Sequence, residues 1–133
     1  MAAFHFELVS PEKLLFSGSV DSVVVPGSEG EFTVLAQHAP TMAVLRVGVV
    51  KVDAGDGKLS QLFVGGGFAD ISAKGLTILA EKAIPVEELT AARFDADILT
   101  SEKEAASAIT DEARRLANEK VGQLRDVRAT LGL

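Results

Sequence analysis

His5 and His38 are the only imidazoles in this sequence of 133 residues, which has no cysteine. Thiol nucleophiles, thiolate metal sites and disulfide frameworks are therefore excluded, and two histidines make a poor metal site. A Ser-His-Asp arrangement is compatible with the composition, but no G-x-S-x-G nucleophile elbow accompanies either histidine. The sequence predicts a protein without a catalytic or metal site, and a small hydrolase that uses His38 is the weakest alternative.

A run of three glycines, Gly65 to Gly67, invites comparison with a phosphate-binding loop. Such a loop needs a helix N-terminus behind it, and the G-x-x-x-x-G-K pattern is absent, whereas residues 68–72 read as a strand. Close backbone packing or a β-bulge is the better interpretation.

The residues Asp53, Asp56 and Gly57 weakly resemble a calcium-binding loop. Gly55 stands where the second ligand belongs, and Val64 stands where a bidentate glutamate is required. We therefore interpret this segment as the turn of a β-hairpin.

Cations concentrate in the last part of the chain, at Arg114, Arg115, Lys120, Arg125 and Arg128. Acids lie between them, as on an ordinary solvated helix face. The alternative is a basic stripe that binds an acidic protein partner, and cations toward a helix C-terminus are also favoured by the helix dipole. The residues alone leave both interpretations open.

The charge balance, 13 Lys and Arg against 19 Asp and Glu, gives a formal net charge of −6. A chain this acidic lacks the electrostatic attraction that binds nucleic acid. No stretch approaches the ~20 apolar residues needed to span a bilayer, and the first nine residues lack the features of a targeting leader. We expect a protein of the cytoplasmic side, with no nucleic-acid partner and no direct membrane insertion.

The composition changes near Pro85, which we take as a working boundary between two domains, 1–85 and 86–133. The first part holds 10 of the 12 glycines and all four prolines. Its predicted strands are 4–9, 20–25, 47–53, 59–64, 68–72 and 76–80. Short strands at spacings of about ten residues, without an intervening helical pattern, predict an antiparallel β-sandwich.

Residues 86–133 follow the helical period. One apolar stripe contains Leu89, Ala92, Ala96 and Leu99, and another contains Leu116, Val121, Leu124, Val127 and Leu131. These stripes predict an antiparallel hairpin of two helices. We place the break at Thr110, a good N-cap followed by two acids, and keep Ser101, which with Glu104 forms a capping box, as the alternative.

Several short motifs occur in a characteristic order along the chain. They are Gly27-Ser28-Glu29-Gly30-Glu31-Phe32, His38-Ala39-Pro40, Gly48-Val49-Val50, Gly65-Gly66-Gly67-Phe68 and Leu79-Ala80-Glu81. On these motifs the chain resembles the epsilon subunits of bacterial F-type rotary ATP synthases, the equivalents of the mitochondrial delta subunit. The resemblance covers nearly the whole chain, including the order of sandwich and hairpin.

The resemblance implies a non-catalytic subunit of the central stalk, or rotor. Such a subunit binds the gamma subunit and the ring of c subunits, and it couples rotation of the ring to ATP synthesis. It is peripheral, on the cytoplasmic face of the bacterial inner membrane. A free-standing β-sandwich adaptor or binding module with the same architecture remains the alternative.

The family's ring-facing loop matches Ser28, Glu29, Gly30 and Glu31, with His38 nearby. The resemblance therefore implies that these residues contact the c ring. One departure lies close to this loop, because Ala36 and Gln37 stand where many family members have Pro-Gly before the His-Ala-Pro motif.

Some bacterial members bind a nucleotide through a motif of the form Ile/Leu-Asp-x-x-Arg-Ala at the start of the helical hairpin. Leu89 and Arg93 match it, but Thr90 replaces the aspartate and Phe94 the last alanine. Because only part of the recognition set remains, we expect no cofactor, ATP included.

In the family, the hairpin either folds against the sandwich or extends toward the catalytic subunits and hinders ATP hydrolysis. Arg114, Arg115, Arg125 and Arg128 match the basic inhibitory helix, which meets acidic segments of the alpha and beta subunits. The resemblance thus implies a mobile, regulatory hairpin that contacts alpha and beta transiently.

Overall fold

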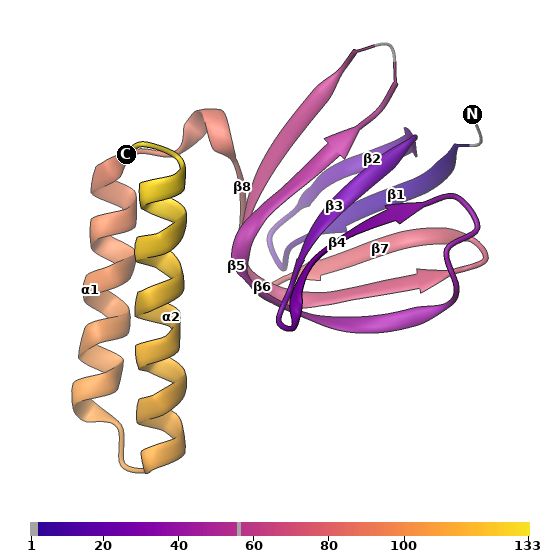
Figure 1. Ribbon diagram of the computed structural model, residues 1–133. Helices are drawn as coiled ribbons and strands as arrows, with labels where there is room; N and C mark the ends of the chain where they lie inside the picture. Colours follow the sequence, from indigo (N-terminus) through magenta and orange to yellow (C-terminus); the bar gives the residue numbers. More distant parts are fainter. Residues whose placement is uncertain (1–2, 56) are drawn as a thin grey trace. The chain divides into compact units, whose positions relative to one another are not determined.

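The computed structural model describes residues 3–55 and 57–133 (Figure 1). Two compact units divide the chain, Met1–Glu87 and Glu88–Leu133. Asp56, assigned above to a hairpin turn, lies outside the described residues.

Within the described residues, the first unit contains eight strands. They are β1 (Phe4–Val9), β2 (Leu14–Val20), β3 (Ser22–Gly27), β4 (Gly30–Leu35), β5 (Thr41–Asp53), β6 (Leu59–Ser72), β7 (Gly75–Ala80) and β8 (Ala83–Pro85), followed by a 3₁₀ turn, η1 (Val86–Glu88). The predicted strands omit β2, β4 and β8. They also divide β6 into two strands at the three glycines, whereas β6 is continuous.

The strands follow the order β2-β1-β7-β6-β5-β3-β4, with β8 paired to β6. Among the described strands, every pair is antiparallel except β1–β7, which is parallel. The two longest strands, β5 and β6, pair along their whole length, and β7 and β8 pair with opposite halves of β6. The sheet thereby folds over on itself into two layers (Figure 1).

The change of layer in β6 occurs at Gly65 to Gly67. Gly66 and Gly67 have φ angles of 104° and 134°, and a Cβ at Gly67 would lie 2.1 Å from the carbonyl oxygen of Leu79. The Gly65 N–H donates to the Lys82 carbonyl at 2.8 Å, and the Glu81 N–H donates to the Gly66 carbonyl at 3.0 Å. The interpretation of these glycines as a site of close backbone packing is therefore confirmed.

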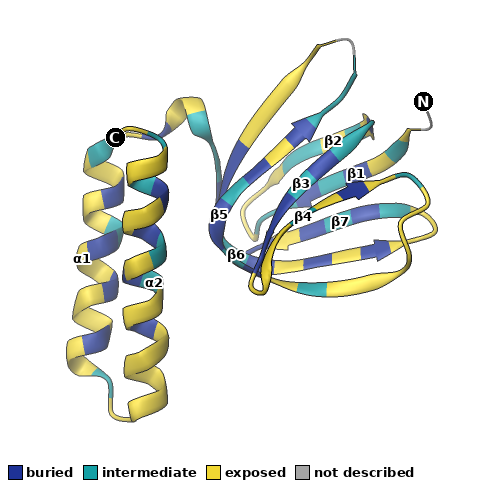
Figure 2. Ribbon diagram, viewed as in Figure 1, coloured by how far each residue is buried: buried dark blue, intermediate teal, exposed yellow. Residues whose placement is uncertain are grey.

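The buried apolar residues of the sandwich form one core cluster, and Figure 2 shows buried positions along the strands of both layers. The core includes the fully buried side chains of Phe6, Leu8, Val23, Val64 and Ile78. Because β1, β3, β6 and β7 all contribute to it, the core joins both layers. The predicted fold class, a β-sandwich followed by a two-helix hairpin, is confirmed.

The second unit contains α1 (Ala91–Ser107) and α2 (Asp111–Thr130). The helix break lies at Thr110, whose Oγ1 accepts the N–H of Ala113 at 3.1 Å, whereas Ser101 lies buried inside α1. Ion pairs between Arg125 and Glu102 (3.2 Å) and between Arg128 and Asp95 (3.4 Å) link the two antiparallel helices.

The predicted apolar stripe of α1 is wrong. Its buried residues are Phe94, Ile98, Ser101 and Ala105, whereas Ala92, Ala96 and Leu99 are exposed and Leu89 precedes the helix. Burying Phe94 and Ile98 removes more apolar area from water than burying alanines does. In α2 the buried residues are Ala117, Val121, Leu124 and Val127, so Leu116, which is exposed, was also assigned wrongly.

Replacing Thr110 with alanine is expected to lower the free energy of unfolding of the hairpin by about 1 kcal/mol, because the N-cap hydrogen bond is lost. Amide hydrogen exchange in the first turn of α2 measures this effect. Thr100→Ala is the matched control, because Thr100 is exposed in mid-helix and its hydroxyl donates only to the carbonyl of Ala96. Equal exchange in the two variants would contradict the capping role.

Candidate functional site

An apolar row crosses the outer face of the sandwich on three adjacent strands. Val44 of β5 pairs with Phe68 of β6, and Phe68 pairs with Leu79 of β7. These side chains are 54%, 52% and 55% exposed. Because one residue on each strand contributes, the three side chains lie next to one another on a single face.

The apolar row continues at both ends. Val9 of β1 pairs with Leu79, and Met42, two residues before Val44 on the same face of β5, is also exposed. A cavity of about 330 Å³ opens beside the row, lined by Val9, Pro11, Phe68 and Leu79 among others. A contiguous exposed apolar surface of this kind is typical of a protein interaction site.

Sequence reasoning missed the apolar row. The alternation in β6 and β7 does assign Phe68 and Leu79 to the same face as each other. The alternation does not give the register that brings Val44 alongside them, because β5 reads as apolar on both faces near Val49 and Val50.

The loop predicted to face the c ring is the β3–β4 hairpin. Ser28 and Glu29 form its two-residue turn, Gly30 has a φ angle of 137°, and Glu31 lies at the start of β4. All four are exposed. The Ser28 N–H donates to the carbonyl of Val44 at 2.8 Å, so this hairpin turn adjoins the apolar row.

His38 lies in the loop between β4 and β5. Its ring is 6.5 Å from that of Phe32, centroid to centroid, and its Nδ1 is 2.9 Å from the Ala39 carbonyl oxygen. His38 therefore lies beside β4, the strand that carries Glu31. Gln37, one of the two departures noted above, has a φ angle of 67°, a left-handed conformation that favours glycine.

All four arginines of the predicted basic stripe are paired with carboxylates inside the hairpin. Arg114 pairs with Asp111 at 2.9 Å, and Arg115 pairs with both Glu112 and Glu119 at 2.5 Å. Arg125 and Arg128 make the two pairs to α1 described above. The stripe is therefore basic in sequence but locally neutralised.

The exposed ion pair between Arg115 and Glu112 changes the pKa of the Glu112 carboxyl group. The hydrogen bond from Arg115, and then its charge, lower the pKa of Glu112 below its ordinary value. A lowered pKa in the folded state means that the pair stabilises the helix at neutral pH. That contribution is lost as the pH falls through the lowered pKa.

The segment that resembles a nucleotide motif forms the start of α1. Thr90 is the N-cap, and its Oγ1 accepts the N–H of Arg93 at 3.2 Å. Phe94 is buried in the hairpin, and Leu89 is buried just before the helix. Both residues that depart from the motif therefore stabilise the helix. Thr90 is its N-cap, and Phe94 is its largest buried apolar side chain.

The described residues contain no group of three or more His, Cys, Asp or Glu side chains that could hold a metal ion. Neither of the described helices is long and apolar enough to cross a membrane.

The apolar row, the adjoining hairpin turn and the neutralised helices together define a class of protein, a β-sandwich subunit with a face for binding other proteins. Comparisons with known proteins agree with that class. The family described as "ATP synthase, Delta/Epsilon chain, beta-sandwich domain" matches residues 3–86. The chain belongs to this family.

Relatives match along almost the whole chain. An ATP synthase epsilon chain of Parvibaculum lavamentivorans is 45% identical over 96% of both chains. Another, of Mesorhizobium japonicum, is 48% identical over 92% of this chain and 90% of its own. The predicted resemblance is thus confirmed: the chain is a non-catalytic ATP synthase subunit, and the adaptor and hydrolase alternatives are set aside.

Solved structures share the fold. A chain in the Euglena gracilis mitochondrial ATP synthase (OSCP/F1/c-ring in rotational state 1) matches with a TM-score of 0.77 and 22% identity, over 98% of this chain and 82% of its own. A chain in the central stalk/c-ring structure of the Tetrahymena thermophila mitochondrial ATP synthase matches with a TM-score of 0.66 and 14% identity, over 92% of this chain and 94% of its own.

Proposed function

We propose that this subunit belongs to the rotor and couples rotation of the c ring, through gamma, to ATP synthesis. The observation that carries the proposal is the apolar row, which leaves three adjacent strands with large side chains more than half exposed. Burying such a row against another protein gives the hydrophobic contribution that a stable interface needs. We assign gamma to this face.

The β3–β4 turn is the proposed contact with the c ring. Glu29 and Glu31 are exposed there and could pair with basic loops of the ring. Each such pair contributes only ~0–1 kcal/mol, so shape must supply most of the affinity. The Ser28–Val44 hydrogen bond supports this assignment, because it holds the turn beside the proposed gamma face and makes the two contacts parts of one surface.

Coupling requires a body that resists deformation between the ring and gamma. The sandwich has a close-packed core, and close-packed interiors have low compressibility. Its two longest strands also run through both layers. These properties support a mechanical role.

The helical hairpin is the proposed regulatory element, which contacts alpha and beta transiently and hinders ATP hydrolysis. An acidic segment of alpha or beta would compete with the acids that already pair with the four arginines. Arg125 and Arg128 pair across the hairpin, so separating the helices would free both side chains. Arg114 and Arg115 pair within α2 and would keep their partners.

We propose no nucleotide cofactor, because Thr90 caps α1 and offers no carboxylate. We further propose a peripheral location on the cytoplasmic face of the bacterial inner membrane, where the c ring would be reached without membrane insertion.

Copurification tests the rotor role. Truncation after Glu87 tests whether the sandwich alone assembles with the complex and whether the hairpin inhibits ATP hydrolysis. Tagged full-length chain from native membranes is expected to bring down gamma, alpha, beta and c subunits. The truncated chain is expected to do the same, because the apolar row and the β3–β4 turn both lie in the first unit. Complexes with the truncated chain are expected to hydrolyse ATP faster.

Each result can fail separately. Absence of all four subunits from the full-length sample would contradict the rotor role. If only the truncated chain failed to copurify, the hairpin would be needed for assembly. Equal hydrolysis rates would remove the inhibitory role while leaving the rotor role intact.

A further inference from the structure

The cavity of about 330 Å³ beside the apolar row opens over the end of β7, between β6 and β1. Phe68 of β6 forms one wall, Val9 and Pro11 form the other, and Leu79 of β7 lies between them. Two strands that flank a common neighbour are roughly 10 Å apart. An α-helix with its side chains is ~10–12 Å wide. The space therefore admits one side chain of a partner and not a helix.

Among the described residues that line this cavity, Glu81 is the charged one. Its Oε2 is 3.5 Å from the position that a Cβ would take at Gly66, so the carboxylate lies over β6, where that glycine has no side chain. The Glu81 N–H donates to the Gly66 carbonyl at 3.0 Å, which holds the backbone in place. The next residue, Lys82, lies over Gly65 and does not line the cavity.

Apolar walls with one carboxylate are complementary to an arginine side chain. Its methylene groups can pack on apolar surface while its charged head stays near a partner. The planar guanidinium can stack on the ring of Phe68 and pair with a carboxylate through two hydrogen bonds, which an ammonium cannot do. A wholly apolar side chain would instead leave the Glu81 carboxylate desolvated and without a counter-charge, which is costly.

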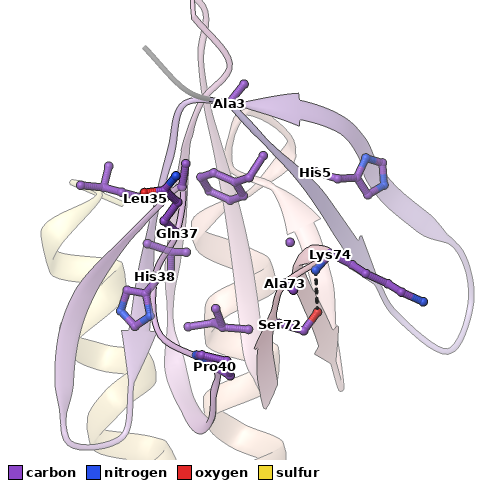
Figure 3. A pocket seen from close by; sticks show the side chains of 14 residues that line it. Ala3, His5, Leu35, Gln37, His38, Pro40, Ser72, Ala73 and Lys74 are labelled. Atoms are coloured by element: carbon purple, nitrogen blue, oxygen red, sulfur yellow. Dashed lines mark hydrogen bonds between the residues drawn. The ribbon is translucent and has the colours of Figure 1, made fainter.

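A larger cavity, of about 620 Å³, lies elsewhere on the sandwich and lacks this combination (Figure 3). The side chains of His5 and Lys74 point away from it in Figure 3. Two of its apolar lining residues, Val34 and Ile71, are only 1% and 3% exposed. It therefore offers a ligand little apolar surface and no lysine.

We propose that one arginine of gamma inserts into the cavity beside the apolar row, with its methylene groups between Phe68 and Val9 and its guanidinium paired with Glu81. This inference rests on the proposed assignment of gamma to the apolar row, and it names the chemistry by which gamma is recognised there. Arginine is one of the residues that most often dominate the binding energy of an interface. A charge pair enclosed at an interface mainly slows dissociation.

Glu81→Gln tests the role of the carboxylate. Bound to synthase complexes that otherwise lack this subunit, the variant is expected to dissociate at least about tenfold faster than the unmodified chain, because the guanidinium loses its ionised partner. Glu12→Gln is the matched control, because it removes the same charge from an exposed residue that does not line the cavity. It is expected to change the dissociation rate less than about twofold. Circular dichroism verifies that both variants fold.

Single Arg→Gln variants of gamma identify the occupant of the cavity. With one of these variants, Glu81→Gln is expected to cause no further increase in the dissociation rate, because the pair is already broken. The inference is overturned if Glu81→Gln dissociates at the unmodified rate or if no arginine of gamma couples to Glu81. Either result leaves gamma assigned to the apolar row, provided that Phe68→Glu weakens binding. Normal binding by Phe68→Glu would overturn both.

Discussion

Replacing Gly67 with alanine is expected to unfold the sandwich or to lower its free energy of unfolding by more than about 3 kcal/mol. The added Cβ would lie 2.1 Å from the carbonyl oxygen of Leu79, on a backbone with a φ angle of 134°. Neither β6 nor β7 can retreat without breaking the ladder between them. Urea denaturation followed by far-UV circular dichroism measures the change, since the chain has no Trp or Tyr for fluorescence.

Gly30 provides a matched control for that experiment. Its φ angle, 137°, is nearly the same, but no atom lies within 4 Å of the position where a Cβ would be built. Gly30→Ala is therefore expected to cost only ~1–2 kcal/mol, the backbone strain alone. Equal losses for the two variants would show that the contact with Leu79 is not the reason for glycine at position 67.

Phe68→Glu is expected to weaken binding to gamma at least about 100-fold while the chain stays folded. The Phe68 side chain is 52% exposed, so the carboxylate can be hydrated in the free subunit. In the proposed complex it would be desolvated against apolar groups without a partner, which is costly. Titration of the variant into synthase complexes that lack this subunit measures the affinity, and circular dichroism verifies the fold.

Leu59→Glu is the control for the gamma interface. Leu59 is even more exposed, at 74%, but it lies at the start of β6, outside the apolar row. This variant is expected to bind normally. If it binds as poorly as Phe68→Glu, the loss reflects added charge in general. If Phe68→Glu binds normally, gamma does not use the apolar row.

The sequence predicted those parts of the fold that short-range chemistry determines. The six predicted segments fall in β1, β3, β5, β6 and β7, and the N-cap chemistry of Thr110 located the helix break. Three strands were missed: β2, with sequence LLFSGSV, does not alternate, β4 begins in what reads as a glycine loop, and β8 has only three residues. Their strand character comes from pairing with β1, β3 and β6.

The error in α1 has a related cause. Ala92, Ala96 and Leu99 fit a helical period as well as Phe94 and Ile98 do. The period alone does not say which of these two helix faces is buried. Side-chain size would have ranked them, since a phenylalanine and an isoleucine bury more apolar area than two alanines. The buried hydroxyl of Ser101 could not have been anticipated from its polarity.

The candidate sites depended even more on long-range pairing. Family resemblance identified the β3–β4 turn and the arginines, but the apolar row requires the register of three strands. Likewise, the carboxylates that neutralise Arg125 and Arg128 lie on the other helix. The packing of α2 against α1 is needed to find them.

The parallel pair of β1 and β7 has a consequence for how the chain folds. Phe6 pairs with Leu76, about 70 residues later in the sequence, whereas the β5–β6 and β6–β7 hairpins close over short loops. Closing the longest loop costs the most chain entropy, so β1 is expected to join the sheet late. During synthesis on the ribosome, β1 emerges first and can pair with β2 early, but its other edge stays unpaired until β7 has been synthesised.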